Sequence, residues 1–155
     1  MFGTPLHPLL VHFPIALFIL GTILQVVALW RKDFFDKAAL FLLSVGFISG
    51  IAAYLSGDGA EEFAAAHWGS AYRTAVEIHQ FYATVTLLLF GTAIGLRILF
   101  HFFQKKILIP LMLIFCIFGS ITLALTGHYG GQMVYIQKHV DSLYSPNTKS
   151  SMQNE

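Results

Sequence analysis

Seven histidines are the residues of this 155-residue chain best suited to chemistry. A neutral imidazole is the commonest protein ligand for transition metals, and it also binds the iron of haem. Four of the histidines lie close to the ends of long apolar segments: His7, His12, His79 and His128. Whether these four side chains can bind one metal ion or haem together depends on where the helices and loops that carry them place them.

The composition indicates a membrane protein. Only 11% of the residues are charged and 56% are hydrophobic, whereas soluble domains average about 25% charged residues. A soluble protein of this length could not cover so much apolar surface with polar groups. The composition therefore excludes a disordered chain, a nucleic-acid-binding protein and an ordinary soluble fold, and it indicates one small domain in a lipid bilayer.

Four apolar segments are long enough to cross a bilayer as helices, which takes about 20 residues. The predicted spans are residues 9–30, 38–56, 76–100 and 107–127. The links within the first pair and within the last pair are short, so each pair should form an antiparallel hairpin. We therefore predict an all-α, integral membrane four-helix bundle over residues 1–140 and a polar, flexible tail over 141–155.

The loop between the second and third spans has an apolar character of its own. Residues 59–72 contain Phe63, three consecutive alanines and Trp68. Tryptophan is enriched at membrane interfaces. We therefore expect a short helix that lies in the interface between the two hairpins.

The distribution of cations predicts the orientation. Six cations lie in or beside the two hairpin links: Arg31, Lys32, Lys37, Arg97, Lys105 and Lys106. The other side has three: Arg73, Lys138 and Lys149. Because cytoplasmic loops carry an excess of Lys and Arg, we expect the hairpin links to face the cytoplasm and both chain termini to lie outside.

This topology predicts that histidines meet in the outer half of the bundle, because the starts of the first and third spans and the end of the fourth share one side. Intramembrane ionisable groups usually face the bundle interior or a cavity. His12 and His79 lie deepest and form the preferred pair of axial haem ligands, with His7 and His128 as the competing pair. The remaining histidines are assigned no such role: His67, His101 and His139.

Three functions fit such a cluster. The first is a haem b protein that exchanges electrons with a periplasmic cytochrome c-like carrier or a quinone, as an electron carrier or oxidoreductase subunit. The second binds a Zn, Cu or Fe ion directly through the same four histidines, which must then converge within about 2.0–2.1 Å of a zinc ion. The third is a structural subunit whose histidines form only hydrogen bonds. The sequence is also compatible with an oligomer.

Small and hydroxylated residues add three expectations. Glycines four residues apart predict close helix packing, or a face that a flat porphyrin can approach: Gly46 with Gly50, and Gly91 with Gly95. The segment 126–132, Thr-Gly-His-Tyr-Gly-Gly-Gln, predicts the end of the fourth helix. Thr86 lies seven residues after His79 on the same helix face, so its hydroxyl is a candidate either to orient the imidazole or to bond a backbone carbonyl of its own helix.

Two motifs resemble those of a known family. Residues 6–17, Leu-His-Pro-Leu-Leu-Val-His-Phe-Pro-Ile-Ala-Leu, resemble the opening signature of the domain-of-unknown-function 2231 (DUF2231) membrane family. Residues 126–135, which continue as Met-Val-Tyr after Gln132, are similar to its last-helix motif, and His79 lies where members carry a third-helix histidine. The resemblance covers nearly the whole chain.

The resemblance implies a four-helix protein of the bacterial inner membrane. Members of the family sometimes occur beside cytochrome c-like or Rieske-like modules, which implies respiratory electron transfer and a b-type haem. Some relatives carry a further histidine just after the last Gly-Gly pair. This chain has Gln132 there, so it lacks one candidate ligand that those relatives have.

Overall fold

The computed structural model describes residues 7–57 and 70–144, and residues 1–6, 58–69 and 145–155 lie outside the description. The described residues form four long α-helices: α1 (His7–Val27), α2 (Lys32–Leu55), α4 (Ser70–Phe103) and α5 (Leu108–Tyr144). Each helix is long and apolar enough to cross a bilayer. A helix suits that environment because it satisfies its own backbone polar groups where no water is present. The prediction of an all-α protein with four membrane spans is confirmed.

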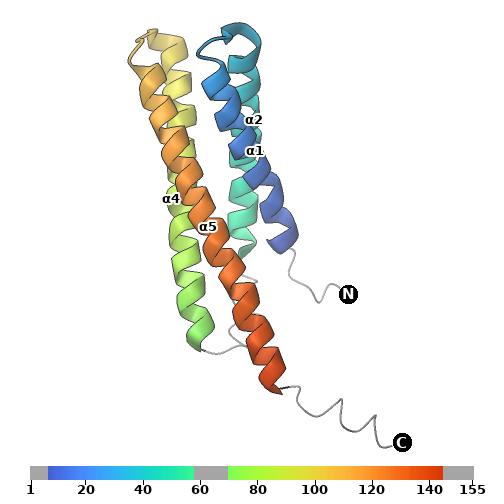
Figure 1. The fold of residues 1–155 in the computed structure, drawn as a ribbon. Helices are drawn as coiled ribbons and strands as arrows, with labels where there is room; N and C mark the ends of the chain where they lie inside the picture. Colours follow the sequence, from blue (N-terminus) through green and yellow to red (C-terminus); the bar gives the residue numbers. More distant parts are fainter. Residues whose placement is uncertain (1–6, 58–69, 145–155) are drawn as a thin grey trace, which may run out of the picture.

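The helices form two antiparallel hairpins that lie side by side (Figure 1). α1 packs on α2 and α4 packs on α5, and the hairpins meet where α2 contacts α4 and α1 contacts α5. The short links, residues 28–31 and 104–107, lie together at one end, which we call the hairpin end. The opposite end, where α1 and α4 begin and α2 ends, is called the histidine end.

Three helix ends, two of α1 and one of α4, follow from local chemistry. α1 begins with Pro8 in its first turn, where the missing N–H needs no partner, and it continues through Pro14. α4 ends at Phe103, and the following Gln104 adopts a left-handed conformation with φ of 52° and donates its N–H to the carbonyl of Phe100. Residues 28–31 close the first hairpin through backbone hydrogen bonds back to the last turn of α1.

The predicted end of the fourth helix at residues 126–132 is wrong, because α5 continues to Tyr144. A glycine costs a helix about 1 kcal/mol relative to alanine, which weakens the helix without ending it. The helix thus includes residues 141–144, the start of the segment assigned to the polar tail. α4 begins at Ser70, earlier than predicted, and the rest of the expected interfacial helix, residues 59–69, lies outside the described residues.

Aromatic rings and glycines join the two hairpins at the centre of the bundle. Phe18 of α1 and Phe90 of α4 are both buried and stack face to face, with ring centroids 4.0 Å apart. Gly46 and Gly50 of α2 lie against the ring of Phe18, and Gly119 of α5 lies against Phe90. A methyl group at Gly119 would meet the Phe90 ring at 2.9 Å. The close packing predicted for the first glycine pair is therefore confirmed.

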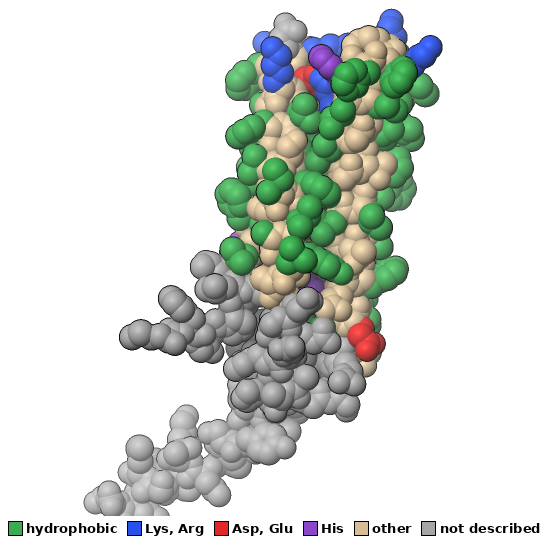
Figure 2. All heavy atoms as spheres, turned by 180° about the vertical axis from the view of Figure 1, so that it is seen from behind, with side chains coloured by type: hydrophobic (Ala, Val, Ile, Leu, Met, Phe, Trp, Pro, Cys, Tyr) green, Lys and Arg blue, Asp and Glu red, His purple; other side chains and the backbone are tan. Residues whose placement is uncertain are grey.

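The outer surface is apolar along the length of the bundle and charged at its ends. Figure 2 shows hydrophobic side chains over the length of the helices, with Lys and Arg gathered at the hairpin end. Large hydrophobic residues are 69% exposed at Ile48 and 66% exposed at Leu88. Such a surface is stable against lipid and not against water. The chain is an integral membrane protein with four spans.

Candidate functional site

His79 is a predicted site residue whose side chain forms a hydrogen bond to another helix. It lies in the third turn of α4, half-buried, and its Nδ1 is 2.9 Å from the backbone carbonyl oxygen of Thr126 on α5. Because a carbonyl oxygen only accepts, Nδ1 carries the proton and donates this hydrogen bond. In the neutral imidazole, the lone pair then lies on Nε2. The contact therefore fixes both the tautomer and the direction of the ring.

A glycine on α5 permits this approach. In a regular helix the carbonyl of Thr126 also accepts the N–H of Gly130, one turn on, and an oxygen with two lone pairs can accept both bonds. A methyl group at Gly130 would lie 3.3 Å from Cε1 and from Nδ1 of His79. One helical turn from His79 and Thr126, the rings of Tyr82 and Tyr129 stack with centroids 5.3 Å apart. Together these contacts hold α4 and α5 in register at the imidazole.

Three threonine hydroxyls continue the polar contacts toward the bundle centre. Oγ1 of Thr86, which is 2% exposed, lies 2.9 Å from Oγ1 of Thr122 and 3.4 Å from Oγ1 of Thr126. Each hydroxyl also bonds a carbonyl of its own helix. Of the two roles expected for Thr86, the structure shows the bond to a carbonyl of its own helix, whereas Nδ1 of His79 donates to the main-chain oxygen of Thr126. Thr86 instead bonds to the side chain of that same residue.

His12 and His128 lie at the histidine end, as His79 does, but their side chains are on exposed faces of α1 and α5. His12 is exposed, and it lies seven and eleven residues before Ile19 and Ile23, which are also exposed. His128 is exposed and has its Nε2 3.0 Å from Nε2 of Gln132, one turn further along α5. The axial pair expected for haem thus combines a half-buried imidazole on α4 with an exposed one on α1.

Of the other four histidines, the structure describes the side chain of His101 only. His101 lies at the hairpin end, exposed, with its ring edge-on to Phe102. The main chain of His7 begins α1, but its side chain is outside the description, as are His67 and the side chain of His139. The structure therefore places His12, His79 and His128 of the predicted site set.

A site that holds a metal ion through protein ligands alone needs three or four of them close together. Among the residues described, no group of three or more His, Cys, Asp or Glu side chains could hold a metal ion. The lone cysteine, Cys116, is buried in the apolar core of the bundle. The described side chains therefore offer single imidazoles and no preformed metal cage.

Sequence reasoning missed a polar cluster at the hairpin end. Gln25 is 2% exposed near the end of α1, and Arg97 of α4 forms an ion pair with Asp36 of α2. The ion pair joins residues that are 61 positions apart in the sequence, and Arg97 entered the sequence analysis only as one of the cations beside a link. Gln25 was detectable, because it is a lone amide inside an otherwise apolar segment.

The family was found by comparison with known proteins. The model of the predicted membrane protein family DUF2231 matches residues 3–141, which is most of the chain. No curated protein and no solved structure matches it. The match agrees with the four apolar helices and with the motifs at both ends of the sequence. The chain therefore belongs to the DUF2231 family of predicted membrane proteins.

Proposed function

We propose that this protein is a membrane-embedded electron-transfer protein that binds haem b at the histidine end of the bundle, with His79 as one axial ligand. The observation that carries the proposal is the 2.9 Å hydrogen bond from Nδ1 of His79 to the carbonyl oxygen of Thr126. Metal-bound histidines almost always donate their other ring N–H to a carbonyl, a carboxylate or water. That bond orients the ring and makes Nε2 a better ligand.

The environment of His79 is compatible with haem. The close approach at Gly130 lets the α5 backbone hold the ring, and the Tyr82–Tyr129 stack adds aromatic surface beside it. Haem would need only two imidazoles, which two different helices could supply. Direct coordination of a Zn, Cu or Fe ion needs at least three close ligands, and the described part of the chain has no such group. The arrangement therefore favours haem over a directly bound ion.

The second axial ligand would come from a different helix. His12 on α1 is the first candidate, because it lies at the same end and is exposed at the bundle surface. His7 and His128 are the competing candidates. When bound, haem would supply a one-electron redox centre, while this chain would hold the iron through imidazoles and shield the porphyrin with apolar side chains.

The cations predict the orientation of the protein, and the orientation in turn suggests its redox partners. The cations of the hairpin end favour that end on the cytoplasmic side of a bacterial inner membrane, with both termini outside. The haem would then lie near the outer face, where a periplasmic cytochrome c-like carrier or a quinone could exchange electrons with it. The protein would act as an electron carrier or as a subunit of an oxidoreductase.

A structural subunit without a cofactor is the second candidate. The His79–Thr126 bond joins two helices, and such bonds in membranes contribute about 0.6 kcal/mol on average without any ligand. His128 likewise has a side-chain partner in Gln132 on its own helix. These bonds account for both imidazoles in purely structural terms.

The visible spectrum of the protein purified from its native membrane distinguishes the candidates. Haem predicts a sharp Soret band that shifts when dithionite is added. A stoichiometric metal without that band would indicate direct coordination instead. A protein with neither a Soret band nor bound metal would contradict the proposal and leave the structural function.

A further inference from the structure

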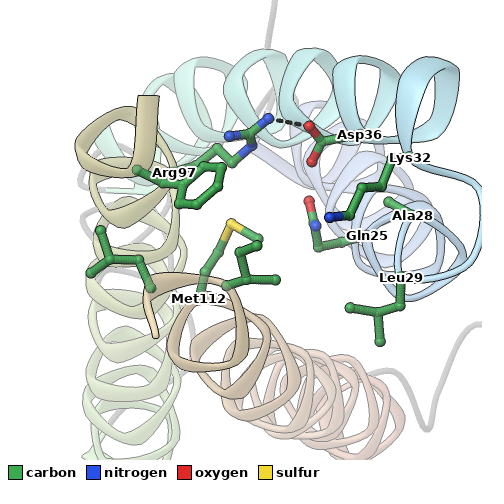
Figure 3. Close-up of a pocket in the computed structure, with 10 residues that line it drawn as sticks. Gln25, Ala28, Leu29, Lys32, Asp36, Arg97 and Met112 are labelled. Carbon is green, nitrogen blue, oxygen red and sulfur yellow. Dashed lines mark hydrogen bonds and ion pairs between the residues drawn. The ribbon is translucent and has the colours of Figure 1, made fainter. Parts of the chain in front are cut away.

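A cleft at the hairpin end has the features of a binding site and plays no part in the haem proposal. It has a volume of about 260 Å³ and lies between the two hairpins, with residues from all four helices in its walls (Figure 3). Its polar lining comes from Gln25, Lys32, Asp36 and Arg97. Apolar side chains, among them Leu29 and Met112, form the remaining walls.

Two buried polar atoms in this cleft lack a hydrogen-bond partner within the described chain. They are Oε1 of Gln25, which accepts, and Nε of Arg97, which donates. Gln25 is 2% exposed, and Figure 3 shows its amide directed into the cleft. A buried donor or acceptor without a partner destabilises the protein, because it loses its hydrogen bonds to water and gains none in return. A ligand that both accepts and donates hydrogen bonds would remove this cost at both atoms.

The charges of the lining determine what such a ligand carries. Asp36 is paired with Arg97, whose guanidinium also lies 5.4 Å from the centroid of the Phe100 ring. Lys32 has its ammonium directed toward the Gln25 amide in Figure 3. Two cations and one carboxylate leave one net positive charge in the lining, which a ligand with a single negative charge balances.

The position of the cleft indicates that the ligand reaches it from the membrane. Gln25 lies within two residues of the end of α1, and the following Trp30 is 76% exposed. Exposed tryptophans mark the level of the lipid headgroups. Basic pockets between membrane helices at that level bind anionic headgroups. The apolar wall at Leu29 and Met112 suits the glycerol backbone and the start of an acyl chain.

We propose that this cleft binds the headgroup of one phosphatidylglycerol molecule, an anionic phospholipid with free hydroxyls. The phosphate accepts hydrogen bonds from Nε of Arg97 and from the Lys32 ammonium. A headgroup hydroxyl donates to Oε1 of Gln25. The bound lipid thereby joins α1, α2 and α4 at the end of the bundle where the Asp36–Arg97 ion pair also connects the two hairpins.

Native mass spectrometry of the detergent-purified protein tests this proposal. The probes are phosphatidylglycerol, phosphatidylcholine, ubiquinone and sn-glycerol 3-phosphate. We expect one phosphatidylglycerol to be retained in preference to each of the others. Equal retention of phosphatidylcholine would overturn the proposal, and preferred retention of ubiquinone would assign the cleft to a neutral ring. Preferred binding of sn-glycerol 3-phosphate would show that the phosphate comes from a soluble ester and would overturn the lipid source.

Three variants locate the bound lipid. Lys32→Gln should weaken phosphatidylglycerol binding about fivefold, because one cation near a headgroup contributes about a factor of five. Gln25→Met keeps the side-chain volume, removes the acceptor and should weaken binding about threefold. Lys37→Gln removes an exposed cation that does not line the cleft, and we expect at most a small change. If Lys32→Gln and Lys37→Gln bind the lipid equally well, the lipid does not occupy this cleft.

Discussion

Substitution of Gly130 by alanine tests the contact that orients His79. The new Cβ would lie 3.3 Å from two atoms of the imidazole, whereas carbon atoms pack at about 3.5–4.0 Å. The ring must then retreat by about 0.2–0.7 Å. This movement lengthens the 2.9 Å bond to Thr126 to about 3.1–3.6 Å, and most of that range lies beyond the usual limit of about 3.2 Å.

The same substitution at two neighbouring glycines provides the control. A methyl group at Gly127 or Gly131 would meet nothing within 4 Å, so alanine there should stabilise the helix by about 0.5–1 kcal/mol. Gly130→Ala has the same helix gain, but it loses an interhelical bond that contributes about 0.6 kcal/mol on average and up to about 1.7. We therefore expect Gly130→Ala to be less stable than Gly131→Ala by the contribution of that bond, about 0.6 kcal/mol and at most about 1.7 kcal/mol.

Unfolding of the three variants by SDS in mixed micelles, followed by circular dichroism, measures this difference. In a protein that retains haem, Gly130→Ala should also lower the haem content, while Gly127→Ala and Gly131→Ala should not. The reasoning fails if the stability of Gly130→Ala lies within about 0.3 kcal/mol of that of Gly131→Ala, the usual uncertainty of such comparisons.

Three further substitutions test the packing and the polar contacts by the same unfolding assay. Gly119→Ala should destabilise the bundle by about 1–3 kcal/mol through overpacking against Phe90, and Gly95→Ala, which meets nothing within 4 Å, should not. Thr86→Val should cost about 0.6 kcal/mol by removing its bond to α5, and a neutral result would show that this contact contributes nothing. Asp36→Asn should cost about 1.5–3 kcal/mol, because it weakens a charge-assisted hydrogen bond to a largely buried arginine, and unchanged stability would contradict a structural role for that ion pair.

The four spans were predictable from the sequence because the bilayer sets both the length and the composition of each helix. The short links within each pair also predicted the pairing of the helices. The end of α5 was not predictable from Gly127, Gly130 and Gly131. A glycine commonly ends a helix by adopting a left-handed conformation, and within residues 7–57 and 70–144 the residue in that conformation is Gln104, just after α4.

The candidate site was predictable in part. The topology correctly gave the end of the bundle at which His12, His79 and His128 lie, because alternating spans fix that end. It did not give the face of each helix. A shift of one residue rotates a side chain by about 100°, and the faces depend on which side packs in the core. The cleft at the hairpin end was missed because all four helices contribute to its lining. Its residues are therefore far apart in the sequence and form no motif.

The most direct test of the proposed function compares the dithionite-reduced minus oxidised spectra of the wild-type protein and two histidine variants purified from the native membrane. We predict a haem difference spectrum for the wild type, its loss in His79→Ala, and its retention in His101→Ala, because His101 is exposed in the last turn of α4, at the opposite end. A wild-type protein without a haem spectrum, or a His79→Ala variant that retains as much haem as His101→Ala, would contradict the assignment of His79 as an axial ligand.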